Sequence, residues 1–361
     1  MSPDEYLKHL QRKLAKHYLD FSTDSVRAYL EENRPDLVHW RPGLTDEEID
    51  QQVDRVVNEV RRNYGPLDSV LAAIKTKLVR TCDPCGREEI AAVPVGSMFT
   101  EDPNGWVIRS PNGAPVVGVH TGVMHLCYWT SNAIAVVHEI DGQGSRRRNL
   151  TTEEMRTISR RLLNSCITLI TGGQVVPQDV HNPLNFAQLH MGCYIMDSME
   201  MFIVGHEFGH ISLGHLDESP LCSSDGIQYY LTSCQEEEYK ADKWSLDRML
   251  WIKANEAAIP KEEWWLVNGP SLALSALLAL EKAEDVLVRI TPRFLKDAPK
   301  QVLTMSNSTH PPTLRRRTNL LEDMARQLGA EDPDYQEAKD LAAFLDTIVD
   351  IFDEVSEDMV F

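Results

Sequence analysis

The chain lacks both long apolar runs and an export signal. No stretch approaches the ~20 apolar residues that a membrane-spanning helix needs. Its first residues, Met1 to Glu5, contain neither the basic nor the apolar segment of a signal peptide. Cysteine is also scarce, with seven scattered through 361 residues. An odd number without an export signal is typical of reduced thiols, so we expect a cytoplasmic protein that does not enter a membrane.

Basic residues are in short supply. Lysine and arginine number 36 against 55 aspartates and glutamates, which gives a net charge of −19. A phosphate backbone would repel such a chain, so we expect no sequence-independent binding to nucleic acid. The same charge favours solubility and, weakly, basic or neutral partners. The length of 361 residues is enough for one large domain or two of ordinary size.

A second closely spaced cysteine pair is also missing. Cys82 and Cys85 form a lone C-x-x-C, which is consistent with half of a zinc knuckle or with a redox pair. A structural zinc ribbon needs a second such pair, and the other five cysteines are isolated. We therefore interpret these two thiols as part of an ordinary turn.

The run from His206 to His210 carries the strongest chemical signal. It reads H-E-x-x-H, and residues four apart on a helix share a face, so both histidines can direct a ring nitrogen to one metal ion. Glu207 then lies close enough to reach a water beside that ion. An exposed helix with two unconnected histidines is the simpler explanation. However, residues 199–205 are mostly apolar, and buried histidine and glutamate need partners, which favours a metal site.

A later acidic segment offers a third ligand, which is the number that catalytic zinc usually has. Glu238 and Asp242 are four apart and share a helical face. We expect Glu238 to bind the metal and Asp242 to accept a hydrogen bond from the outer ring nitrogen of His206. Ala241 is small enough to let the two helices pack closely. The alternative is a solvated acidic helix start, which describes the two glutamates before Glu238.

These motifs resemble a known family. HEFGHISLGH followed by EEEYKADKW is similar to the gluzincin metallopeptidases, and in particular to the HtpX and CaaX-prenyl-protease branch. In that branch the later E-x-x-A-D or E-x-x-x-D supplies the third zinc ligand, and a further histidine follows the first motif as His215 follows His210. Members of that branch are commonly membrane proteins, and this chain is not. The Lit-type phage-exclusion peptidases and the antirepressor-type peptidases, which are soluble and have an H-E-x-x-H helix, are the alternative.

A third stretch, S-T-H-P-P-T followed by an arginine, extends the resemblance over roughly residues 185 to 325. By resemblance, His310 and Arg316 lie near the active site and support the transition state or the ion pairs of the site. The alternative is a helix entry at Pro311 and Pro312 followed by an exposed basic stretch. Both explanations remain open.

Apolar spacing and capping signals predict helices at 45–60, from 66, and at 151–171, about 185–213, about 235–257, 260–290, 311–328 and 333–356. Runs of β-branched and aromatic residues predict strands at 93–95, 106–108, 115–120, 123–130 and 133–140. We expect an α+β, mainly α fold with a small mixed sheet packed on the H-E-x-x-H helix. An edge strand of that sheet would bind an extended peptide, although the sequence does not say which one.

The predicted organisation has three parts. A helical N-terminal region (1–88) gates access or senses a partner, a zincin-like metallopeptidase domain (89–330) follows, and a C-terminal helix (331–361) ends the chain.

Three histidines in the strand-rich region are expected to be packed or surface residues and not ligands: His120, His125 and His138.

The predicted activity is that of a zinc-dependent endopeptidase with a cytosolic protein as its substrate. Zn²⁺ held by His206, His210 and Glu238 lowers the pKa of a water. Glu207 accepts its proton and passes it to the leaving amine. The unranked candidates for stabilising the oxyanion are Tyr239, His310 and Arg316.

Two other functions stay open. One is a regulatory or interaction protein that keeps a metal site for stability, although such a site has no use for Glu207. The other is a zinc amidase that acts on a small substrate. Because an unregulated cytosolic protease would be hazardous, we also expect a regulatory partner or a trigger ligand. A role in stress or phage defence rests on analogy alone.

Overall fold

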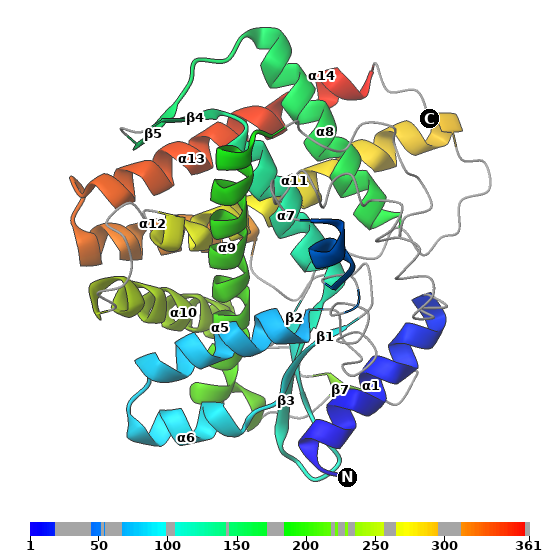
Figure 1. Cartoon of the computed structure of the whole chain (residues 1–361), viewed down its shortest axis with the longest axis vertical. Coiled ribbons are helices and arrows are strands. Elements are labelled where there is room, and N and C mark those ends of the chain that lie inside the picture. Colours follow the sequence, from blue (N-terminus) through cyan, green and yellow to red (C-terminus); the bar gives the residue numbers. More distant parts are fainter. Residues whose placement is uncertain are drawn as a thin grey trace.

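The computed structural model describes residues 1–18, 45–51, 54, 67–98, 105–141, 144–171, 184–217, 221–222, 228–229, 235–255, 265–294 and 312–357. The fold is α+β and mainly helical, with a small mixed sheet beside a long central helix (Figure 1). Within these residues, no helix has the length and apolar character that a bilayer crossing requires.

Most of the described chain is helical. The helices are α1 (Pro3–Tyr18), α5 (Asp68–Thr81), α6 (Pro84–Ala92), α7 (Thr121–Ala135), α8 (Thr152–Ile170), α9 (Phe186–Ser212), the short 3₁₀ helix η1 (His215–Asp217), α10 (Gln235–Asn255), α11 (Trp265–Phe294), α12 (Thr313–Leu328), α13 (Pro333–Asp350) and α14 (Phe352–Ser356). The helices predicted at 151–171, 185–213 and 235–257 are α8, α9 and α10, so these predictions are confirmed. Half of the helix predicted at 45–60 lies outside the described residues, and residues 46–51 and 54 are helical.

Local sequence explains where α8 and α9 begin. The Thr151 hydroxyl accepts a hydrogen bond from the backbone N–H of Glu154, whose carboxylate accepts in return from the N–H of Thr151. Asn185 and Gln188 exchange the same pair of hydrogen bonds ahead of α9. These capping boxes satisfy N–H groups that a helix start otherwise leaves without a partner.

The sheet has five strands in the order β1-β3-β2-β7-β6. β1 (Val95–Met98) is parallel to β3 (Pro115–His120), whereas β2 (Gly105–Arg109) is antiparallel to β3. β7 (Gln228–Tyr229) joins β2 through the pair Ile108 and Tyr229, and β6 (Leu221–Cys222) pairs with β7. A separate hairpin is formed by β4 (His138–Asp141) and β5 (Gly144–Arg147).

Two predicted strands are wrong. Residues 123–130 lie inside α7, and of residues 133–140 the first part ends α7 while only His138 onward is strand. Twelve of the fifteen residues of α7 are buried, and the other three, His125, Tyr128 and Trp129, share one narrow face. Because buried residues cover most of the circumference, the sequence shows only a weak 3.6-residue period and looks like a buried strand. The strand predicted at 93–95 is displaced to 95–98.

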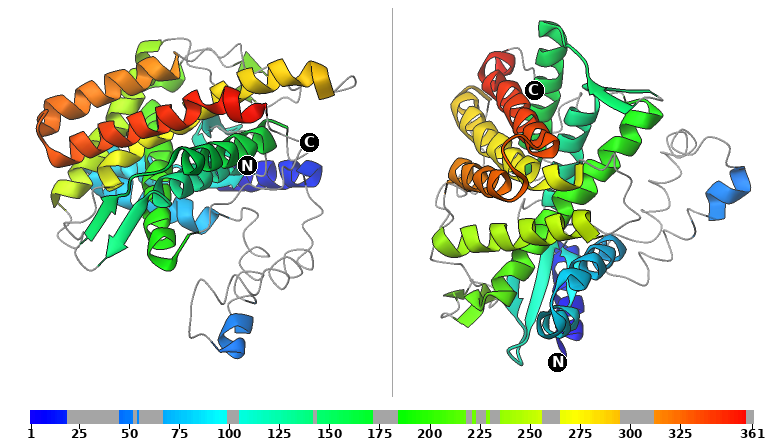
Figure 2. Two further views of the ribbon diagram at one scale, coloured as in Figure 1. Left: turned by 90° about the horizontal axis from the view of Figure 1, so that it is seen from above. Right: turned by 90° about the vertical axis from the view of Figure 1, so that its left-hand side faces the viewer.

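α9 is the central element of the packing. It contacts α7, α10 and α11 most extensively, and β2 and β3 lie beside its C-terminal half (Figures 1 and 2). α1 packs on β1 and β3, and α5 packs on β1 and α9. The sheet therefore covers the end of α9 that carries the H-E-x-x-H run.

The C-x-x-C residues connect α5 to α6. Cys82 follows α5 and is buried, whereas Cys85 lies in the first turn of α6 and is exposed. The Asp83 carboxylate caps α6 by accepting a hydrogen bond of 2.8 Å from the N–H of Gly86. The two thiols are free, as expected for a turn.

Candidate metal centre

The H-E-x-x-H residues lie on the last two turns of α9. His206, Glu207 and His210 are 8%, 7% and 5% exposed, so all three are buried. The two imidazole rings meet edge to face with their centroids 4.6 Å apart. Their Nε2 atoms approach to 3.0 Å. The helical face that the spacing predicted is therefore present, with both ring nitrogens directed at one point.

A seam of small residues brings α10 against this face. A Cβ atom on Gly209 would lie 3.0 Å from the Cα and 3.1 Å from the carbonyl oxygen of Ala241. A Cβ on Gly205 would lie 2.3 Å from the Ser245 hydroxyl oxygen. Only glycine at these two positions allows such an approach. The sequence analysis identified Ala241 for this role but missed the two glycines, whose spacing of four residues was the available signal.

Glu238 reaches the two histidines from α10. Its Oε2 lies 3.4 Å from Nε2 of His206, and its Oε1 lies 3.5 Å from Nε2 of His210. One potential ligand atom from each of the three residues lies within 4.8 Å of the others. Two imidazoles and one carboxylate are a donor set that suits Zn²⁺. The structure thus brings together the three residues that were expected to hold the metal.

Asp242 and Arg316 support this group from behind. The Asp242 carboxylate lies 2.8 Å from Nδ1 of His206. Arg316 of α12 donates to both oxygens of Asp242, at 2.6 and 2.8 Å, and its Nη1 lies 3.4 Å from Oε2 of Glu238. The arginine therefore connects the two carboxylates of α10 and fixes their orientation toward α9.

The protonation states of the histidines follow from these contacts. Burial acts to lower the pKa of His206, but the hydrogen bond and charge of Asp242 outweigh it and raise that pKa to about 10. Burial and the neighbouring His206 lower the pKa of His210 to about 3. Two Nε2 atoms and a carboxylate thus face one another at one position in the cluster. A divalent cation fits the same position, because it would interact favourably with all three donors at once.

Glu207 points toward the sheet. A Cβ atom on Gly105, the first residue of β2, would lie 2.8 Å from Oε1 and 3.1 Å from Cγ of Glu207. β2 therefore passes directly over the carboxylate, and glycine provides the clearance. The sequence analysis did not single out Gly105, since its role depends on a contact across more than one hundred residues.

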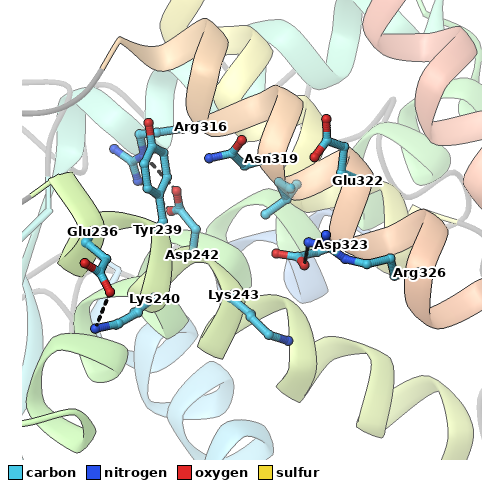
Figure 3. A pocket seen from close by; sticks show the side chains of 11 residues that line it. Glu236, Tyr239, Lys240, Asp242, Lys243, Arg316, Asn319, Glu322, Asp323 and Arg326 are labelled. Atoms are coloured by element: carbon cyan, nitrogen blue, oxygen red, sulfur yellow. Dashed lines mark hydrogen bonds and ion pairs between the residues drawn. The ribbon is translucent and has the colours of Figure 1, made fainter.

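The three candidates for oxyanion stabilisation are placed differently. Arg316 is engaged with Asp242 and Glu238, as described above. Tyr239 lines a groove of about 480 Å³ between α10 and α12, where its ring lies beside Arg316 and its centroid is 5.9 Å from Cζ of Arg315 (Figure 3). Asp242 also lines this groove. His310 lies outside the described residues.

Among the described residues, the group that could hold a metal contains none of the three histidines that were not expected to be ligands. His120 is buried, with its ring 5.6 Å from Trp106. His138 is buried, and its Nδ1 lies 2.8 Å from the carbonyl oxygen of Ile134. His125 is exposed on α7. These are the packed and surface environments that the sequence analysis described.

The site defines a class: a buried His–His–Glu group that could hold a metal ion, with an acidic residue next to the first histidine. A model of the peptidase U49 family matches residues 124–335, which is more than half of the chain and includes α9 and α10. The chain therefore belongs to the peptidase U49 family. This is the Lit-type family that the sequence analysis gave as an alternative to the HtpX branch. No curated protein and no solved structure matches the chain.

Proposed function

We propose that this protein is a zinc-dependent endopeptidase whose active site is the group His206, His210 and Glu238 with Glu207 beside it. Membership of a peptidase family supports hydrolysis of a peptide bond. The convergence of three buried donor side chains supports a bound divalent cation. The observation that carries the proposal is the position of Glu207, which lies on the same helical turn as the ligand pair and faces a strand.

The roles of the protein groups follow from this geometry. A cation at the site would supply a Lewis acid that polarises the scissile carbonyl and lowers the pKa of the attacking water. Glu207 accepts the proton of that water and transfers it to the leaving amine. Asp242 holds His206 with Nδ1 protonated, so that Nε2 stays available, and Arg316 keeps Asp242 ionised. Arg316 acts here as a positioning residue.

β2 is the strand that we assign to substrate binding. It begins at Gly105, beside the Glu207 carboxylate. In the described residues, β7 pairs with β2 only at Ile108. An extended peptide along the Gly105 end of β2 would bring a backbone carbonyl close to Glu207, and main-chain hydrogen bonds would bind it with little demand on its sequence.

Glu207→Gln tests the assignment. The variant should bind Zn²⁺ as the wild type does, and its turnover should fall by about 100- to 10 000-fold, because the amide cannot accept a proton. New protein termini in cells that produce each form provide the readout, together with cleavage of casein. The matched control is Glu236→Gln, which changes an exposed glutamate on α10 that pairs with Lys240. Cleavage by Glu207→Gln at the wild-type rate would show that the role is misassigned.

Gly105→Ala tests the role of β2. The added Cβ would displace the Glu207 carboxylate, so we expect turnover to fall at least about tenfold while Zn²⁺ affinity is retained, since a small misplacement of a catalytic group is costly. Gly113→Ala, in the turn between β2 and β3, strains a backbone with a φ of +84° but places no atom near Glu207, so it is the comparison for general effects on the sheet. Unchanged turnover in Gly105→Ala would show that the passage of β2 over Glu207 does not matter for catalysis.

A cytosolic substrate, a trigger ligand and a gating N-terminal region remain predictions from the sequence. A purely structural metal site is the second candidate function. Binding of Zn²⁺ by both the wild type and Glu207→Gln, with no cleavage by either form in any assay, would favour it.

A further inference from the structure

The two ligand histidines have different partners at their outer ring nitrogens. Nδ1 of His206 faces the Asp242 carboxylate at 2.8 Å. Nδ1 of His210 faces Nδ1 of His215 at 3.0 Å. One histidine is thus supported by an anionic group, and the other by an imidazole. Asp242 is buried, whereas His215, the first residue of η1, is partly exposed.

The backbone after α9 is shaped to bring His215 back to His210. The helix ends at Ser212, and Gly214 adopts a φ of +73°, a left-handed conformation that other residues rarely take. Its N–H donates to the carbonyl oxygen of Ile211 at 3.0 Å. The chain reverses, and the His215 ring meets the His210 ring edge to face, with centroids 5.2 Å apart.

A contact from the sheet holds this turn in place. Arg109 of β2 donates from Nε and Nη2 to the carbonyl oxygen of Leu216, at 3.3 and 2.8 Å. The residue after His215 is therefore tied to the same strand that passes over Glu207. The position of His215 is thus set by a helix end and by the sheet.

The chemistry of the pair follows from which nitrogen of His210 faces the metal site. Nε2 of His210 lies 3.0 Å from Nε2 of His206 and 3.5 Å from Glu238, so Nε2 is the ligating atom. A neutral imidazole that ligates through Nε2 carries its hydrogen on Nδ1. That N–H needs an acceptor, and Nδ1 of His215 is the atom within reach.

We propose that His215 is a positioning residue for the metal centre: its Nδ1 accepts a hydrogen bond from Nδ1–H of His210 and holds that ligand in the tautomer that presents Nε2. The inference rests on the proposed function, since it requires that His210 binds a metal. The proposal also means that the two ligand histidines are supported unequally. His206 is oriented by a carboxylate that Arg316 fixes, and His210 is oriented by a neutral ring at the surface, so His210 has the weaker support.

Zinc affinity of the full chain tests the proposal, measured by competition with a chromophoric chelator. His215→Ala removes the acceptor and should weaken Zn²⁺ binding by about 10- to 100-fold, as is usual for groups that orient metal ligands. His215→Asn places its side-chain oxygen where Nδ1 was, so its affinity should stay within about threefold of the wild type. His215→Asp supplies a carboxylate and should bind Zn²⁺ more tightly than His215→Asn.

The control is His190→Ala, at the other end of α9, where the ring contacts Tyr194; its zinc affinity should equal that of the wild type. Circular dichroism of the metal-free proteins checks that all variants fold. If His215→Ala and the wild type bind Zn²⁺ equally well, the proposal is overturned. Equal loss in the Ala and Asn variants would also overturn it, because the hydrogen bond would then not matter. Failure of the wild type itself to bind Zn²⁺ would instead defeat the proposed function.

Discussion

Two groups of buried carboxylates lie along α9, and their surroundings differ. At its C-terminal end, Glu238 and Asp242 of α10 are 1% and 3% exposed, and both lie within reach of Arg316 and a histidine. In its middle, Glu200 is 2% exposed. Among the described residues, its Oε2 has no hydrogen-bond partner. The first region surrounds its carboxylates with cationic groups, and the second does not.

The protonation of the two regions differs accordingly. Burial alone would raise the pKa of Asp242, but the charge and hydrogen bonds of Arg316 hold it below its usual value. For Glu200, burial and the charge of Asp197 act together and raise the pKa well above 4.5. Burial and the charge of Glu200 also raise the pKa of the Cys127 thiol on α7. A buried carboxyl is ionised only where partners replace its hydration, so the anionic region is the candidate for binding a cation.

The largest change in stability is expected from replacing Arg316, which contacts both Glu238 and Asp242. Arg316→Gln leaves Asp242 buried without its main counter-charge, so the free energy of unfolding of the metal-free protein should fall by about 3 to 5 kcal/mol. Urea unfolding measures it. The neighbouring Arg317 forms a similar two-point contact with Asp346, whose side chain is 47% exposed. Water can replace that arginine, so Arg317→Gln should cost only about 1 to 2 kcal/mol. Equal losses of unfolding free energy in the two variants would show that burial does not make the Arg316–Asp242 pair more important than the Arg317–Asp346 pair.

Adding metal should stabilise the folded protein through the group of His206, His210 and Glu238, and not through Glu200. Zn²⁺ at a concentration of 100 times its Kd should raise the free energy of unfolding by about 2.7 kcal/mol, and a chelator should reverse the effect. Mg²⁺ at the same concentration is the control, because it prefers all-oxygen ligands and should have little effect. Thermal unfolding of the wild type and of Glu238→Gln measures the shift. A shift of the same size in Glu238→Gln would exclude this carboxylate as a ligand.

The smallest expected effect is a gain in stability when Glu200 is replaced. Because the pKa of Glu200 is raised in the folded state, the folded protein binds more protons than the unfolded one above pH 4.5, and stability falls as pH rises from there. Glu200→Gln cannot ionise. We expect it to be more stable than the wild type at pH 7 and equally stable below pH 4.

Urea unfolding from pH 4 to pH 8 measures that difference. Glu88→Gln, which changes an exposed glutamate on α6, should show no such dependence on pH. A Glu200→Gln variant that is less stable than the wild type at pH 7 would show that the carboxylate has an ionised role, and the contrast between the two regions would then be wrong.

Most of the metal group was predictable because its signals are local. The spacing of His206 and His210 follows from the period of a helix, and Glu238 and Asp242 repeat that period on a second helix. Capping-box spacing marked the start of α8 for the same reason, and the structure shows a second capping box at the start of α9. α7 was mistaken for strand, because buried residues cover most of its circumference and leave only a weak amphipathic period.

The sequence by itself determined which residue types share a helical face, since that depends only on backbone geometry over one or two turns. Tertiary structure alone decided how those faces meet. The crossing of α9 and α10 at Gly205 and Gly209, the passage of Gly105 over Glu207 and the return of His215 to His210 all join segments whose contact depends on how the whole chain packs. Short-range spacing carries no information about such approaches, because they are set by side-chain volumes on both partners.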